Sequence, residues 1–211
     1  MFATLDIEQE MIILYTNIIS KVNHFGKKKI MFISARQGEG TSTIAQEFAK
    51  VASLTFGNSV ILVDIDLNHL ESSQIFDIDQ SDLGNSTTDD HSHSAISQMS
   101  PHAPFAQIQP IIPLLPSSHM FSFYEVEHTL SEVGKAYDLV VVDSPPVKLS
   151  ANGLALAARV DGVVIVVEAD STRGPIVKRL VDNITQAGGN ILGMVLNKRR
   201  NYIPSTIYKR L

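Results

Sequence analysis

The sequence predicts a single α/β domain in which a mainly parallel sheet is covered by helices on both faces. The first observation is that short, fully apolar runs alternate with segments of helical periodicity, which is typical of strands buried between two helical layers. The second is that several of these runs end in glycine-rich or acidic residues, and open parallel sheets bind their ligands beyond the carboxyl ends of the strands. The expected strands are residues 30–33, 60–66, 139–143, 162–167 and 191–197, and the expected helices are about 44–51, 122–135, 150–159 and 173–187.

Composition narrows the function classes before any motif is considered. The chain has 211 residues, of which 44% are hydrophobic and 18% charged, so one domain can bury a sizeable core. A net charge of -5 argues against a general nucleic-acid binder, and the absence of cysteine excludes disulfides and thiolate chemistry. No signal peptide and no apolar run of about 18–20 residues is present, so we expect a cytoplasmic protein that reaches a membrane only by recruitment.

Three segments are expected to lie outside the alternating core of this single domain, 1–211. Within residues 1–25, apolar side chains spaced three or four apart predict an amphipathic helix over 5–22, namely Ile7, Met11, Leu14, Ile18 and Val22. That helix either packs on its own domain or faces a partner. Residues 78–119 read as a variable insertion, partly a mobile surface loop, in which prolines confine any strand at 107–116 to an edge. Residues 198–211 form a basic tail.

The stretch from Ser34 to Thr43 has the strand–loop–helix context of a phosphate-binding loop. Gly38 and Gly40 allow backbone N–H groups to turn around an anion, and the following helix adds its positive N-terminal end. Ser42 and Thr43 stand where hydroxyls reach Mg²⁺ and phosphate, whereas Thr41 stands where the standard G-K-[ST] pattern requires lysine. The alternative is a glycine-rich turn that is capped by Ser42.

Acidic residues follow two of the expected strands. Asp64 and Asp66 end the second strand and, being two residues apart, point to the same face if strand geometry persists. Asp143 follows three valines in the manner of a Walker B acid that orders Mg²⁺ or its water. The alternatives are a pair of turn aspartates and, for Asp143, a turn or helix cap before Pro145.

Together these motifs resemble the bacterial tyrosine autokinases of capsule and exopolysaccharide synthesis, within the wider group of partition and division-site P-loop ATPases. The family loop reads roughly S-x-x-P-G-E-G-K-S-T, and residues 34–43 here read S-A-R-Q-G-E-G-T-S-T. The family's D-x-D-L-R corresponds to D-I-D-L-N at 64–68, and its D-x-P-P corresponds to D-S-P-P at 143–146. The later blocks 158–167 and 193–197 are similar as well, so the resemblance covers about residues 8–77 and 120–200.

The resemblance implies a three-layer P-loop fold that binds ATP or ADP with Mg²⁺. It implies catalytic roles for Asp64 and Asp66, and metal binding by Ser42, Asp66 and Asp143. The residues that it places at the nucleotide are Gly38, Glu39, Gly40, Thr41, Ser42, Thr43 and Asn197. It also implies a membrane-bound chain-length or co-polymerase partner at the inner membrane, and self-association into a homo-oligomer.

The departures from the family concern catalysis rather than folding. Thr41 replaces the loop lysine and Asn68 replaces the arginine of the second motif. The family's N-terminal E-x-x-R-x-x-R, which is used to form rings, is lost, since Gln9, Ile12 and Tyr15 stand there. We therefore expect a regulator with weak or lost catalysis.

Two rival functions remain. The first is an active autokinase that uses Mg-ATP, in which Arg36 takes the place of the lysine and Tyr202 or Tyr208 of the tail is phosphorylated. The second is a partition-type ATPase, against which the Pro145-Pro146 form of the Walker B motif speaks.

Overall fold

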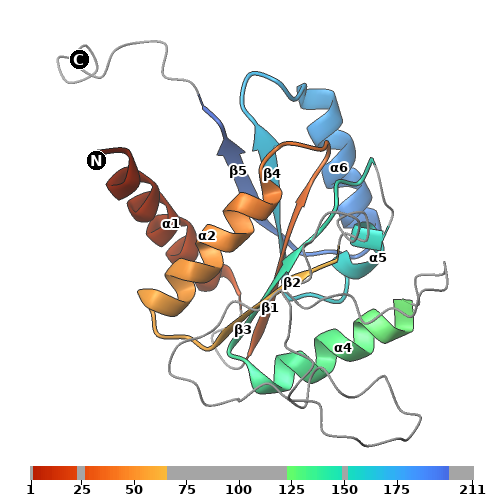
Figure 1. Cartoon of the computed structure of the whole chain (residues 1–211). Helices are drawn as coiled ribbons and strands as arrows, with labels where there is room; N and C mark the ends of the chain where they lie inside the picture. The colour runs from red at the N-terminus through yellow and green to blue at the C-terminus, as the bar shows by residue number, and fades with distance from the viewer. Residues whose placement is uncertain (1, 23–26, 66–122, 149–151, 200–211) are drawn as a thin grey trace, which may run out of the picture.

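The described residues form one sheet that is parallel throughout its five strands. The computed structural model describes residues 2–22, 27–65, 123–148 and 152–199. Within them the strand order is β2-β3-β1-β4-β5 (Figure 1). The strands are β1 (Lys28–Ser34), β2 (Val60–Asp64), β3 (Leu139–Asp143), β4 (Gly162–Glu168) and β5 (Ile191–Asn197). Every pairing between neighbours is parallel, so all the carboxyl ends lie along one edge of the sheet.

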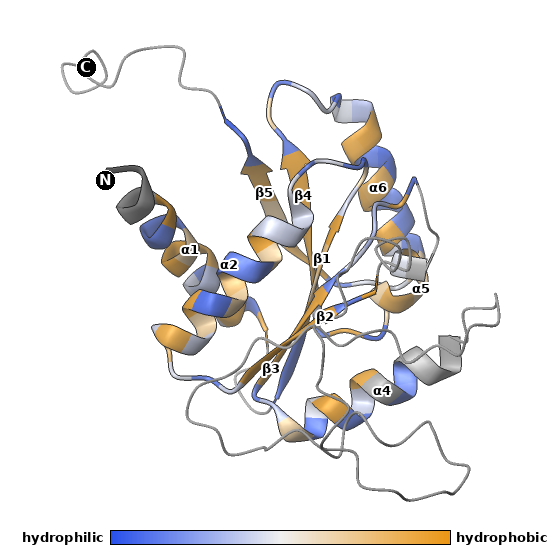
Figure 2. Ribbon diagram, viewed as in Figure 1, coloured by the Kyte–Doolittle hydropathy of each residue, from blue (hydrophilic) through white to orange (hydrophobic). Residues whose placement is uncertain are grey.

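Helices cover the sheet on both faces (Figure 1). Helices α1 (Phe2–Lys21) and α2 (Thr41–Leu54) contribute to one buried cluster with the inward side chains of the strands. Helices α4 (Phe123–Ala136), α5 (Asn152–Ala157) and α6 (Gly174–Gln186) contribute to a second cluster on the opposite face. Figure 2 shows the strands as almost continuously hydrophobic and the helices as mixed, which is the pattern of a sheet buried on both sides.

Four aromatic rings pack together on the first face. Phe48 of α2 is completely buried, with its ring centroid 5.1 Å from that of Phe32 and 5.6 Å from that of Tyr15. Tyr15 of α1 also stacks on Phe56, at 4.1 Å between centroids. Burial raises the pKa of the Tyr15 phenol, whose oxygen accepts a hydrogen bond from Asn58. Helix α1 is thus joined to the domain through α2, the helix that follows the glycine-rich loop at 34–40.

The predicted fold class is confirmed, and most boundaries agree within three residues. The helix after the loop begins at Thr41 rather than near Ile44, because Gly40 at φ 90° leads directly into its first turn. The N-terminal helix runs over Phe2–Lys21 and packs on its own domain through Met11, Ile18 and other buried residues. Ile7, expected on the same apolar face, is instead 49% exposed.

Other predictions fall outside the described residues. These are the insertion at 78–119, the tail with Tyr202 and Tyr208, and the positions of Asp66 and Asn68. Among the helices that the structure describes, none combines the length and the hydropathy needed to cross a bilayer.

Strands β2 and β3 are joined at their amino-terminal ends by hydrogen bonds between Ser59 and Asp138. The Asp138 carboxylate accepts hydrogen bonds from the backbone N–H of Ser59, at 2.9 Å, and from its hydroxyl, at 2.6 Å. These bonds lower the pKa of Asp138. They join the residue before β2 to the residue before β3, and so help to set the register that brings Asp64 opposite Asp143 at the other end.

Candidate nucleotide-binding site

The loop between β1 and α2 adopts a backbone that depends on two glycines. Gly38 has φ 85° and Gly40 has φ 90°, in the left-handed region that residues with a side chain rarely adopt. The Gly40 carbonyl accepts the N–H of Ile44 at 3.0 Å, so the loop passes without a break into the helix. This geometry agrees with a phosphate-binding loop and requires glycine at both positions.

Gly40 is also a point of close approach. A Cβ atom built there would lie 2.2 Å from Nδ2 of Asn197, at the end of β5. That amide nitrogen donates to the Glu39 carbonyl at 2.8 Å. The loop is therefore packed against the end of β5, with no room for a side chain between them.

The first turn of α2 supplies hydroxyl groups at the predicted positions. Ser42 and Thr43 are exposed, whereas Thr41 is buried. The N-cap residue is Gly40, which makes no side-chain cap, so a turn capped by Ser42 is not what the structure contains. The backbone N–H groups of a first helical turn have no partner within the helix, and they favour a bound anion.

The Glu39 side chain is directed into the protein. It is 1% exposed and accepts hydrogen bonds from the backbone N–H of Arg36 at 2.7 Å and of Glu168 at 3.3 Å, and from the Thr172 hydroxyl. These contacts tie the loop to the end of β4 and to the turn before α6. Any role of Glu39 in nucleotide binding therefore falls to its backbone.

Two aspartates lie opposite each other beside the loop. In the parallel register of β2 and β3, Asp64 is the direct partner of Asp143, and Asp143 in turn pairs with Phe32 of β1. Because these three strands are parallel neighbours, about 4.8 Å apart, both aspartates lie at the edge of the sheet at which the loop begins. Asp143 is 6% exposed and Asp64 is partly buried.

The oxygen-bearing side chains predicted as metal ligands are of the kind that bind Mg²⁺ together with water and phosphate. Among the described residues no group of three His, Cys, Asp or Glu side chains gathers as a metal site. Mg²⁺ typically takes one or two carboxylates and completes its shell with water and substrate phosphates. Of the magnesium ligands that the sequence predicts, Ser42 lies in the first turn of α2 and Asp143 at the end of β3, while Asp66 lies outside the described residues.

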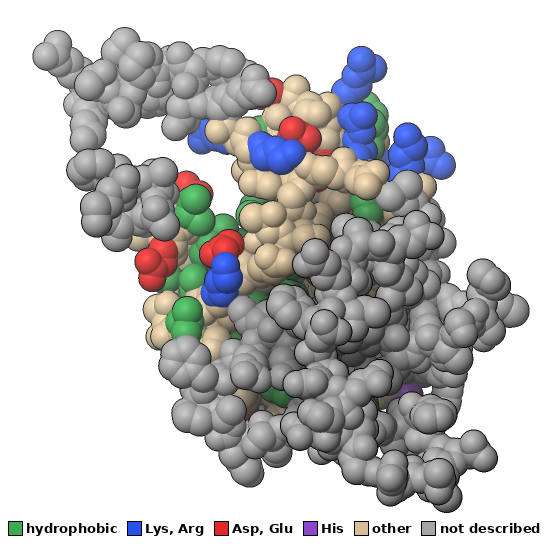
Figure 3. Space-filling model, in the orientation of Figure 1, with side chains coloured by type: hydrophobic (Ala, Val, Ile, Leu, Met, Phe, Trp, Pro, Cys, Tyr) green, Lys and Arg blue, Asp and Glu red, His purple; other side chains and the backbone are tan. Residues whose placement is uncertain are grey.

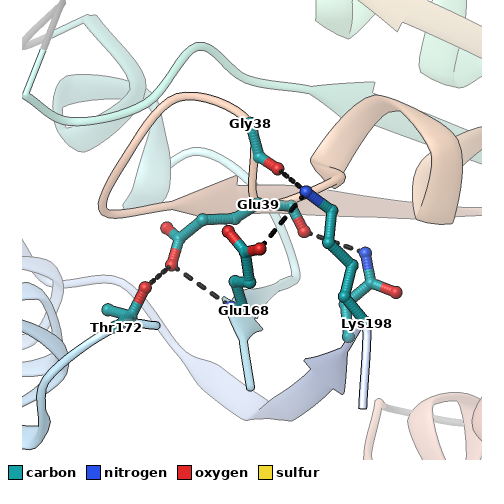
Figure 4. A network of polar contacts seen from close by, with 6 residues as sticks. Gly38, Glu39, Glu168, Thr172 and Lys198 are labelled. Atoms are coloured by element: carbon teal, nitrogen blue, oxygen red, sulfur yellow. Dashed lines mark hydrogen bonds and ion pairs between the residues drawn. The ribbon is translucent and has the colours of Figure 1, made fainter. Parts of the chain in front are cut away.

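A network of polar contacts behind the loop was not predicted from the sequence (Figure 4). The Lys198 ammonium donates to the Gly38 carbonyl and lies 3.6 Å from a carboxylate oxygen of Glu168. Thr172 and Asn197 reach Glu39 from the ends of two other segments. Sequence reasoning assigned Lys198 only to the basic tail. The sequence feature that could have indicated this role is the position of Lys198 directly after Asn197, at the carboxyl end of a strand.

Basic side chains are frequent at this end of the molecule. Figure 3 shows lysine and arginine groups along the upper part of the face in view, including the region of the start of α6. Arg36 in the loop is exposed, as are three residues at or near the start of α6, namely Arg173, Lys178 and Arg179. Positive charge at one end of a protein raises the local concentration of anionic ligands there.

Comparison with known proteins confirms the resemblance seen in the sequence. No family model matches the chain. Curated relatives that it does match are named as tyrosine-protein kinases, among them CpsD of Streptococcus agalactiae. That protein is 25% identical over 201 residues, which cover 87% of this chain and 82% of the relative.

Solved structures confirm the fold. The chimerical protein CapA2B2 superimposes with a TM-score of 0.60 at 22% identity, covering 88% of this chain and 82% of that one. A plasmid partition protein from Borrelia burgdorferi superimposes with a TM-score of 0.54 at 18% identity, covering 89% and 86%. The chain therefore has the three-layer α/β fold of P-loop nucleotide hydrolases.

Proposed function

We propose that this chain is a nucleotide-binding P-loop protein that regulates polysaccharide chain length or export, with weak or lost phosphoryl transfer. The observation that carries the proposal is a complete loop frame in which threonine occupies the lysine position. Gly38 and Gly40 have the positive φ angles of such a loop, and Thr41 is the first residue of α2. Asp64 and Asp143 are register partners at the ends of neighbouring strands. The relatives named as tyrosine-protein kinases support the polysaccharide context that the motifs imply.

The residues present fit the phosphates of ATP or ADP and a magnesium ion. The loop leaves no room for a side chain at Gly40, and the first turn of α2 presents Ser42 and Thr43. Bound Mg²⁺ would supply neutralising charge at the phosphates, with Ser42, Asp66 and Asp143 as its protein ligands. Gly38, Glu39, Gly40 and Thr41 would contact the phosphates through their backbone N–H groups, and Asn197 would hold the loop from behind.

Thr41 explains why binding and catalysis should separate in this protein. In phosphoryl transfer, catalysis consists mostly of positioning and of charge stabilisation on the transferred group. A threonine retains a hydrogen-bond donor but carries no charge. The backbone cradle that binds the ground state is intact, so the loss falls mainly on the chemical step.

The alternative is an active Mg-ATP-dependent autokinase. Asp64 would then activate a tyrosine hydroxyl, with Asp66 as a further catalytic residue and with Tyr202 or Tyr208 as acceptors. The exposed Arg36 favours this alternative, because it places a positive charge in the loop itself. Phosphotyrosine on the protein purified from its own cells would distinguish the two functions.

The regulatory role predicts that the protein reaches membranes through a protein partner. In cells that contain a membrane-bound chain-length protein, we expect the chain in the membrane fraction, and after deletion of that partner in the supernatant. The reason is that no described helix can cross a bilayer, while a basic tail contributes at most about 1 kcal/mol per charge at an anionic surface. Membrane association that is unchanged by the deletion would contradict this role.

A further inference from the structure

Two consecutive residues at the end of β5 hold two consecutive carbonyl groups of the phosphate-binding loop. Asn197 donates from Nδ2 to the Glu39 carbonyl at 2.8 Å, and the Lys198 ammonium donates to the Gly38 carbonyl (Figure 4). The partners are 158 and 160 positions apart in the chain. Because both acceptors are backbone carbonyl oxygens, these contacts fix the backbone of the loop directly.

The consequence follows from the planarity of the peptide group. In a trans peptide the carbonyl and the next residue's N–H point in opposite directions, and the chain contains no cis peptide among its described residues. Holding the Gly38 carbonyl therefore sets the direction of the Glu39 N–H. Holding the Glu39 carbonyl sets the direction of the Gly40 N–H. Both N–H groups are then turned away from β5.

The backbone of Lys198 shows that its position is specified. Its φ of 57° lies in the left-handed region, which is uncommon for a residue with a long side chain. Such a conformation persists where surrounding contacts determine it. Here the ammonium is held between the Gly38 carbonyl and the Glu168 carboxylate, and the preceding strand residue Asn197 is held by the loop.

We propose that Lys198 is a positioning residue of the phosphate-binding loop, which orients the Glu39 N–H for a nucleotide phosphate. The proposal rests on the proposed nucleotide binding for its ligand, but the clamp itself is present without one. A cationic donor polarises the peptide group to which it binds and so strengthens the N–H on the opposite side. Lys198 also brings a positive charge to a loop in which Thr41 replaces the usual lysine.

The test compares three variants by hydrogen–deuterium exchange of the nucleotide-free protein, read on the peptide that covers residues 34–41. Lys198→Met keeps the side-chain stem and removes the charge, whereas Lys198→Arg keeps the charge. Lys135→Met, at an exposed position in the last turn of α4 and far from the loop, is the matched control. We expect Lys198→Met to speed exchange of the loop about tenfold, Lys198→Arg to restore slow exchange, and Lys135→Met to match the parent.

Calorimetric titration with Mg-ADP is the second arm. Lys198→Met should bind about tenfold more weakly at unchanged thermal stability, with recovery in Lys198→Arg. Three results for Lys198→Met would each overturn the proposal. The first is loop exchange as slow as the parent's, and the second is exchange that rises throughout the domain. The third is an affinity for Mg-ADP equal to the parent's despite faster loop exchange. If neither parent nor variant binds Mg-ADP, the proposed nucleotide binding has failed, and the exchange arm still decides whether Lys198 positions the loop.

Discussion

Replacing Thr41 with lysine should raise ATP hydrolysis by about 10²–10³-fold over the unmodified protein. The new side chain would return one positive charge to the β- and γ-phosphates, and a single preorganised contact of this kind is worth about 3–4 kcal/mol of barrier. The measurement is phosphate release under saturating Mg-ATP. Thr55→Lys, which adds the same charge at the exposed carboxyl end of α2, is the matched control and should leave the rate unchanged.

The same variant should not become a full kinase. Asn68 and the absent ring-forming arginines still limit the docking of a neighbour's tail, and positioning provides most of the catalysis in phosphoryl transfer. Phosphotyrosine blotting should therefore remain low at Tyr202 and Tyr208 while hydrolysis rises. If the unmodified protein already labels itself as strongly as Thr41→Lys, Thr41 is no defect, and the autokinase replaces the regulatory function.

Replacing Glu39 with alanine should lower the free energy of unfolding by about 3 kcal/mol and weaken any nucleotide binding. The buried carboxylate accepts two backbone N–H groups and the Thr172 hydroxyl, and each buried donor that loses its partner costs about 1–3 kcal/mol. Entering water would compensate for part of this loss. Denaturant unfolding measures the change as a lower midpoint at unaltered slope.

Glu47→Ala provides the matched control on the same helix. The Glu47 carboxylate pairs with Lys50 at 2.5 Å, but both side chains are partly exposed to solvent, at 36% and 49%. Ion pairs of this spacing on a helix surface contribute about 0.2–0.5 kcal/mol. A Glu39→Ala variant as stable as Glu47→Ala would show that the carboxylate does not hold the loop in place.

The strands and helices were predictable because a sheet that is buried on both faces needs continuously apolar strands, which alternate in the sequence with segments of helical periodicity. Residues 139–143 form a strand over the range expected, since four consecutive apolar residues followed by an acid are typical of a buried parallel strand. The loop was predictable because Gly38 and Gly40 mark backbone conformations that other residues avoid. The opposition of Asp64 and Asp143 needed the strand order as well, which local patterns do not contain.

The contacts behind the loop were not predictable for the same reason. Glu39 was expected at the nucleotide, yet its side chain is used by Thr172 and by two backbone groups. Lys198 was assigned to a tail, yet it reaches a loop 160 positions earlier. Such partners meet only once β4 is placed beside β1 and β5 beside β4, so their roles depend on topology rather than on spacing along the chain.

Titration calorimetry of the unmodified protein with Mg-ADP and Mg-ATP tests the central claim most directly. We expect saturable binding with a Kd between about 10 μM and 1 mM, or roughly -7 to -4 kcal/mol. Binding should be lost in Gly40→Val, whose side chain would meet Asn197 at a backbone angle that valine does not adopt. Absence of saturable heat at several millimolar nucleotide in the unmodified protein would contradict the account and leave the loop as a purely structural element.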